Sequence, residues 1–258
     1  MGLRTLAERM SQGVVLKRRL PQAFGGGRLF VAPRGGGMRY WRRNMMKMDP
    51  HLFGLADEFV KPGMCVWDIG ANMGLFTFAA ANRAGREGFV LAVEADVDNA
   101  ALLLRSRFAS DRAATAELQV LTVAMGAPGA RFAHFVISDR SRAMNSLEGF
   151  GMGFEGPPHE KRVVPVVTCD ELLASFRAPG FVKIDVEGAE LEVFKGAEKL
   201  LSEVRPVFEL EVAPVAEKQE AIREVFSRHH YKMYDGDVAA NGRLARDLPP
   251  FSCLAMPE

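Results

Sequence analysis

Three groups of polar residues in this sequence are spaced so that they could contact a ligand, and the first runs from Asp68 to Gly74 (DIGANMG). It ends the apolar run 64–69 and precedes a helical pattern. Gly70 and Gly74 let the backbone pass close to a ligand. The G-x-G-x-x-G fingerprint of dinucleotide sites would need a glycine at Asn72, so this pattern differs from it. Asp68 suits a cationic group, such as the amine of an amino-acid moiety.

The second group is a single acid, Glu94, which ends the apolar run 88–94. A carboxylate at the end of a strand can accept hydrogen bonds from both hydroxyls of a ribose. Sites for nicotinamide dinucleotides use the same device, so Glu94 alone indicates only a ribosylated ligand. Together with the motif at Asp68, it points to S-adenosylmethionine. The alternative is that both acids cap loops and that the glycines merely turn the chain.

The third group is FVKIDVEGAE (181–190), which places Lys183, Asp185, Glu187 and Glu190 around the end of another apolar run. Carboxylates gathered there could deprotonate a substrate hydroxyl or bind a divalent metal ion. Glu187 and Glu190 could instead stabilise the helix that follows, through its dipole and its N-terminal capping. Asp185 stands at the strand end itself, where we expect a functional role.

The elements that position these groups alternate between strand and helix. The apolar pattern predicts strands at 64–69, 88–94, 117–125, 181–185 and 206–212, with helices at 51–60, 75–84, 97–109, after 185 and at 214–229. This alternation predicts an α/β fold with a parallel, doubly wound sheet. The segments 231–235 and 251–257 read as strands without a helix between them, so we expect an antiparallel hairpin at one sheet edge. An open parallel sheet binds its ligand beyond the carboxyl ends of its strands.

One segment, 138–162, interrupts the alternation with glycines, Pro157-Pro158 and many charges. A long stretch without regular structure inside a compact domain is usually functional or mobile. Because it follows the third strand, we expect it to act as a lid over the acceptor.

Charge divides the chain into two parts. Residues 1–48 hold 11 Lys and Arg residues and one acid, a net charge of +10, whereas the whole chain carries +1. We interpret 1–48 as a basic N-terminal arm and 49–258 as the main domain. The arm is either a solvated segment or a contact for an anionic partner. The near-zero total argues against nucleic-acid binding by bulk charge.

The three cysteines, Cys65, Cys169 and Cys253, form no C-x-x-C pair and stand beside apolar residues. We therefore expect buried free thiols in a reducing compartment, and neither a zinc site nor a redox motif. The sequence contains no apolar run long enough for a transmembrane helix and no signal-peptide pattern. These features predict a cytoplasmic protein.

Three segments, VWDIGANMGLFTFAAA, the acid of LAVEAD and FVKIDVEGAELEVFKGAEKLL, together resemble the FkbM family of S-adenosylmethionine-dependent methyltransferases. The last segment is close to that family's signature, and the resemblance covers roughly residues 50–256. It implies the Rossmann-like class I methyltransferase fold, with a seven-stranded, mostly parallel sheet and one antiparallel strand. It also implies O-methylation of a small-molecule hydroxyl, typically on a sugar or a secondary metabolite.

The resemblance also implies roles for individual residues. Asp68, Gly70, Asn72 and Gly74 would surround the methionine part of the cofactor, and Asp185 would face the reacting methyl group. Glu94, with its neighbour Ala95, would hold the ribose. Ala124 and Met125, which end the predicted third strand, would lie against the adenine.

Methyl transfer requires a base for the acceptor hydroxyl, and a well-placed base contributes about 100- to 10,000-fold to the rate. Asp185 and Glu187 are the first candidates, and Glu209 and Glu211 of the predicted fifth strand are the second.

Three other functions compete with this one. A nicotinamide-dependent oxidoreductase would need the dinucleotide glycine pattern, which the sequence lacks. A nucleic-acid methyltransferase could use the basic arm, and a cofactor-binding protein could lack catalysis altogether.

Overall fold

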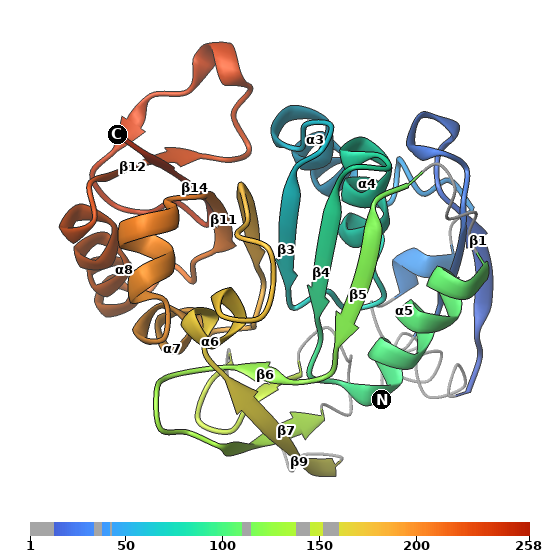
Figure 1. Ribbon diagram of the computed structural model, residues 1–258, viewed down its shortest axis with the longest axis horizontal. Helices are drawn as coiled ribbons and strands as arrows, with labels where there is room; N and C mark the ends of the chain where they lie inside the picture. Colours follow the sequence, from blue (N-terminus) through green and yellow to red (C-terminus); the bar gives the residue numbers. More distant parts are fainter. Residues whose placement is uncertain (1–12, 34–37, 42, 110–114, 138–144, 152–159) are drawn as a thin grey trace.

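The computed structural model describes residues 13–33, 38–41, 43–109, 115–137, 145–151 and 160–258. Within these residues a large mixed sheet is covered by helices on both faces, and a smaller sheet lies at one end of it (Figure 1). The α/β class predicted from the alternating pattern is confirmed.

The large sheet has eight strands within the described part of the chain, in the order β13-β12-β14-β11-β10-β3-β4-β5. Strands β5, β4, β3, β10 and β11 are parallel, and β14 runs antiparallel between β11 and β12. The strands are β3 (Cys65–Ile69), β4 (Phe89–Val93), β5 (Glu117–Leu121), β10 (Phe181–Ile184), β11 (Val207–Glu211), β12 (Tyr231–Asp235), β13 (Ala245–Arg246) and β14 (Ser252–Pro257).

The predicted antiparallel pair at the sheet edge is confirmed, but the predicted count of seven strands is too low by one. The extra strand is β13, two residues that pair with Met233 and Tyr234 of β12. Both residues of β13 are exposed, so no apolar alternation in the sequence indicated a strand there.

Two groups of helices bury the two faces of this sheet. Alternate residues of a strand point to opposite faces, so Val66 packs in one core cluster and Trp67 in the other. The first face is covered by α3 (Pro50–Phe59), α4 (Leu75–Ala84) and α5 (Val97–Ala109), through side chains such as Phe53, Phe76 and Leu103. The second is covered by α6 (Cys169–Leu173), α7 (Glu190–Lys195) and α8 (Ala216–Arg228), through side chains such as Leu172, Val193 and Phe226.

The start of α3 follows the local sequence. Pro50 is its first residue, and the side chain of Asp49 accepts a hydrogen bond from the backbone N–H of Leu52 at 3.3 Å. This capping satisfies one of the free N–H groups that every helix leaves at its start.

A second sheet, which the sequence did not predict, has the order β6-β9-β7-β8. Its strands are β6 (Ala124–Met125), β7 (Phe132–Ile137), β8 (Ser146–Leu147) and β9 (Glu160–Val167). In Figure 1 it lies at the end of the molecule where β5 stops. The predicted strand 117–125 is therefore wrong in its second half, because β5 ends at Leu121 and the chain leaves the large sheet to pair Ala124 and Met125 with β9.

The predicted irregular stretch 138–162 contains β8 and the beginning of β9, so the prediction that it lacks strands is wrong for those parts. Positions 138–144 and 152–159 lie outside the described residues.

The N-terminal segment forms an antiparallel hairpin of β1 (Leu16–Arg19) and β2 (Arg28–Val31). Leu29 and Val31 are fully buried in the core cluster of α3, α4 and α5. The backbone N–H of Phe30 donates to the hydroxyl of Ser106 in α5 at 2.8 Å. The described part of the basic arm thus packs on the main domain, while the division at residue 49 stays a prediction.

Cys65, Cys169 and Cys253 are buried free thiols, as expected. No helix in the described ranges has the length and apolar character needed to cross a membrane.

Candidate functional site

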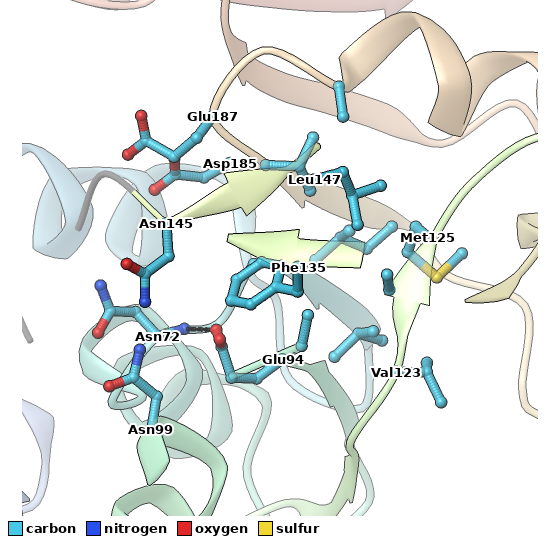
Figure 2. Close-up of a pocket in the computed structure, with 17 residues that line it drawn as sticks. Asn72, Glu94, Asn99, Val123, Met125, Phe135, Asn145, Leu147, Asp185 and Glu187 are labelled. Carbon is cyan, nitrogen blue, oxygen red and sulfur yellow. Dashed lines mark hydrogen bonds between the residues drawn. The ribbon is translucent and has the colours of Figure 1, made fainter. Parts of the chain in front are cut away.

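A cavity opens where β3, β4 and β10 end, on the side expected for a ligand of a parallel sheet (Figure 2). Its wall contains the ends of β3 and β4, the segment after β5 and the loop after β10. The small sheet closes another side, with Phe135 of β7 and Leu147 of β8. These two residues are cross-strand partners, so one face of the small sheet forms an apolar cover over the cavity.

Most of the residues predicted from the sequence meet in this cavity. Those that line it are Gly70, Asn72, Glu94, Ala95, Ala124, Met125, Asp185 and Glu187. Asp68, Gly74 and Glu211 are not part of its wall. Gly74, with φ +88°, is the residue just before α4, and a Cβ added there would meet the side chains of Phe78 and Leu103.

The loop after β3 lies against the loop after β10. Gly70 has φ +78°, and a Cβ added there would lie 2.7 Å from the carbonyl carbon of Asp185 and closer still to its oxygen. The backbone N–H groups of Gly70 and Ala71 both donate to Val93, at 2.9 Å each. Only glycine combines this conformation with this approach. The close neighbour of Gly70 in the structure is the backbone of Asp185, so the predicted approach to a ligand stays a prediction.

Two non-glycine residues at the cavity also have positive φ: Asn72 and Glu187, both at +53°. Such conformations are uncommon outside glycine and cluster at functional sites. Each belongs to the loop that follows a strand ending at the cavity, β3 or β10.

Glu94 is buried and held by its neighbours. Its two carboxylate oxygens accept hydrogen bonds from the backbone N–H groups of Asn72, at 2.6 Å, and Asp96, at 2.8 Å. Burial raises the pKa of Glu94 to about 7, although these two hydrogen bonds favour the ionised form. Because a carboxylate oxygen can accept two hydrogen bonds, each keeps capacity for a ligand hydroxyl.

Asp68 belongs to a row of buried charges on the face covered by α3 and α4. It lies beside Lys183, and Lys183 lies beside Glu209, in adjacent parallel strands. The hydroxyl of Thr77 donates to one oxygen of Asp68, whereas the other has no partner among the described residues. Burial raises the pKa of Asp68, and the charge of Lys183 opposes that effect.

The outer end of this row reaches α3. Glu209 is 2% exposed, and its carboxylate lies 3.3 Å from Nε2 of His51. The hydrogen bond to Glu209 raises the pKa of His51, and burial opposes it. Glu209, a second-choice base, is therefore already engaged with His51 and lies outside the cavity wall.

The acids near the end of β10 and β11 repel one another. Asp185 is paired with Lys183, whose ammonium donates to it at 3.1 Å. Burial, followed by the charges of Asp185 and Glu211, raises the pKa of Glu187 to about 8. Partial loss of water around its carboxyl group, followed by the charge of Asp185, raises the pKa of Glu211 to about 7, while the residue as a whole is exposed. A cation or a proton is therefore favoured beside these groups.

The carboxylates after β10 were also considered as metal ligands and as groups that stabilise the helix that follows. Among the described residues, no group of three or more His, Cys, Asp and Glu side chains is arranged to hold a metal ion. A carboxylate oxygen of Glu190 accepts from the backbone N–H of Gly188 at 2.8 Å, just before α7. Glu190 thus stabilises the start of a helix, as the alternative for that residue predicted.

Sequence reasoning missed several cavity residues, namely Asn99, Phe135, Asn145, Leu147, Val186 and Ala189. Asn145 is fixed by Asp96, which is fully buried and accepts from the amide of Asn145 at 2.9 Å and from the guanidinium of Arg162 at 3.1 Å. These contacts tie the small sheet to the loop that carries Glu94. The signal that would have indicated Asn99 is its place five residues after Glu94, at the start of the helix that follows that acid.

Several known proteins are similar to this chain. A family model described as the methyltransferase FkbM domain matches residues 68–233. The methyltransferase FkbM from Methylobacillus flagellatus KT is similar to this chain at 17% identity and a TM-score of 0.46. That match covers 79% of this chain and 50% of the other, so the chain spans half of that protein's length.

Another similar structure is the O-methyltransferase from Bacillus cereus in complex with SAH, at 13% identity and a TM-score of 0.44, covering 83% of this chain and 82% of the other. The putative transferase PH0793 from Pyrococcus horikoshii is 10% identical with a TM-score of 0.48, and the match covers 93% of this chain and 70% of the other. None of the curated proteins matches this chain.

Proposed function

Because this chain belongs to the FkbM methyltransferase domain family, we propose that it transfers a methyl group from S-adenosylmethionine to a hydroxyl of a small molecule, such as a sugar or a secondary metabolite. Its fold is the class I methyltransferase fold, with an eighth strand added at the edge. The observation that carries the proposal is the cavity, where residues from β3, β4 and β10 that suit this cofactor meet.

The residues of the cavity suit S-adenosylmethionine in three respects. Glu94 offers two oriented oxygens to a ribose, and the glycine at position 70 keeps the β3 loop close to Asp185. Ala124 and Met125, with Phe135 and Leu147, make an apolar end that suits adenine. Asp68 keeps a buried oxygen without a partner among the described residues, although it lies outside the cavity wall.

When bound, the cofactor supplies a methyl group already activated by its positively charged sulfur, so the protein has to align the acceptor and remove a proton. A carboxylate of this chain would take the proton of the acceptor hydroxyl, and the bound cofactor would supply the methyl group to that oxygen. Glu187 lines the cavity and has a pKa of about 8. A general base works best when its pKa lies near the pH of the reaction, and this value is close to neutral pH. Asp185, which also lines it, is the other candidate, and Glu211 lies farther out.

The test is methyl transfer from methyl-labelled S-adenosylmethionine by the full chain. Small-molecule extracts are supplied as acceptors, and the labelled products are identified by mass spectrometry. We expect label on an oxygen of a small molecule. Label on RNA or DNA would instead support a nucleic-acid methyltransferase. Cofactor binding without transfer to any fraction would support a cofactor-binding protein that lacks catalysis.

A further inference from the structure

Asn99 stands in the first turn of α5 and has no role in the proposal above. Its residue is 3% exposed, and it lines the cavity. Its side-chain carbonyl oxygen is buried and has no hydrogen-bond partner among the described residues. Buried polar groups in native proteins are nearly always paired, so an unpaired one requires an explanation.

The backbone around Asn99 is fixed on both sides. The N–H of Asp98 donates to a side-chain oxygen of Asp96 at 3.0 Å, and the N–H of Ala100 donates to the carbonyl of Asp96 at 2.9 Å. Asp96 itself is fully buried and tied to Arg162. The start of α5 is therefore held in place, and Asn99 is presented to the cavity by a rigid element.

The side-chain oxygen of Asn99 requires a hydrogen-bond donor, and no described side chain supplies one. Figure 2 shows the amides of Asn72, Asn99 and Asn145 at the end of the cavity beside Glu94, away from Met125. Both oxygens of Glu94 already accept backbone N–H groups and retain capacity for more. This end of the cavity thus offers several acceptors close together, which suits a ligand group with neighbouring hydroxyls.

We propose that Asn99 is a cofactor-contact residue, whose carbonyl accepts a hydrogen bond from one hydroxyl of the cofactor ribose while Glu94 accepts from the ribose as well. This inference rests on the proposed use of S-adenosylmethionine. It adds a second, neutral acceptor to the single acid that the sequence indicated. It also accounts for the buried unpaired oxygen, because the bound ribose supplies the missing donor.

The test is calorimetric titration of the full chain with S-adenosylhomocysteine. The variants are Asn99→Ala and Asn99→Leu, the second of which keeps the side-chain volume, and the control is Asn241→Ala at an exposed position. We expect both Asn99 variants to bind about 3- to 10-fold more weakly, the range for one hydrogen bond, and the control to bind as the wild type does. The melting temperature of the cofactor-free Asn99 variants should not fall, because the substitutions remove an unpaired polar atom.

A second titration separates contact from structure. The 2′-deoxy and 3′-deoxy analogues of S-adenosylhomocysteine are each titrated into the wild type and Asn99→Ala. If Asn99 binds a ribose hydroxyl, the substitution costs nothing further for the analogue that lacks it. A loss of the same size for both analogues and for the parent compound would overturn the inference.

Two other results are decisive. Unchanged binding by both Asn99 variants, or a fall in stability without cofactor that matches the loss in binding, would refute the contact. A wild type that does not bind S-adenosylhomocysteine would instead refute the proposed function, so the two failures are distinguishable.

Discussion

Gly70→Ala should damage both the fold and the cofactor site, whereas Gly63→Ala should damage the fold only slightly. The two glycines have nearly the same φ, +78° and +79°. An alanine in this left-handed region costs about 1–2 kcal/mol, and both variants share this cost. The atom closest to an added Cβ at Gly63 is Cβ of Glu87 at 4.0 Å, which is ordinary contact.

At Gly70 the added Cβ would collide with the backbone carbonyl of Asp185, which cannot rotate away as a side chain can. The β10 loop would have to move, at a further cost of about 1–3 kcal/mol, the usual range for overpacking. We therefore expect unfolding free energies lower by about 1–2 kcal/mol for Gly63→Ala and by about 2–5 kcal/mol for Gly70→Ala.

Urea unfolding and titration with S-adenosylhomocysteine measure the two effects. Gly63→Ala should bind as the wild type does, because Gly63 precedes β3 and lies at the opposite end of that strand from the cavity. Gly70→Ala should bind at least about 10-fold more weakly, a difference of about 1.4 kcal/mol, since both strand-end loops are displaced. Wild-type affinity in Gly70→Ala would refute the reasoning that the close approach of these loops forms the site.

Three further predictions concern charge. The folded pKa of Glu187, about 8, exceeds its unfolded value of about 4.5, so its contribution to stability is present below about pH 4.5 and is lost as the pH rises through about 8. The unfolding free energy of Glu187→Gln, measured in urea, should therefore increase relative to that of the wild type as the pH rises. A difference that stays constant with pH would contradict this. Arg162→Ala should lower the unfolding free energy by about 1–3 kcal/mol, because buried Asp96 loses a partner. The control Arg223→Ala breaks an exposed ion pair and should lower it by under about 1 kcal/mol. Equal losses in the two variants would contradict the role of Arg162 as partner of a buried acid. Asp185→Asn should fold and bind S-adenosylhomocysteine normally but transfer methyl groups at least about 100-fold more slowly. Full activity of this variant would exclude Asp185 both as base and as metal ligand. A chelator separates the two roles, because it would inhibit the wild type only if Asp185 binds a metal ion.

Local patterns were sufficient for the part of the site that lies at the strand ends. The apolar runs before Gly70, Glu94 and Asp185 are short and buried on both faces, and in a parallel sheet their carboxyl ends meet at one edge. The position of each acid along its strand therefore indicated its place in space. No contact between distant segments had to be known.

The rest of the site depends on pairing between distant segments. The run at β7 does not alternate, because Val136 and Ile137 are both buried while Phe132 is exposed. Its partner β9 lies beyond the stretch of glycines and prolines, and β6 pairs with β9 across some forty residues. His51 and Glu209 meet although 158 positions separate them. Single-sequence patterns contain no information on such contacts.

Asp68 shows how a local pattern can place a residue correctly without defining its surroundings. The motif put this acid near the end of β3, where the structure has it. The alternation of side chains along β3 places it on the face of α4, beside Thr77 and Lys183 and outside the cavity wall. The elements packed on each face of the sheet decide which side chains at a strand end can reach a ligand.

The cavity should bind S-adenosylmethionine and its demethylated product. A calorimetric titration of the full chain with S-adenosylhomocysteine and, separately, with NAD tests this most directly. We expect saturable binding of S-adenosylhomocysteine at one site, no binding of NAD, and affinity lower by about 1–3 kcal/mol in Glu94→Ala, the cost of the polar groups left unpaired. Tighter binding of NAD than of S-adenosylhomocysteine, or no binding of the latter, would contradict it.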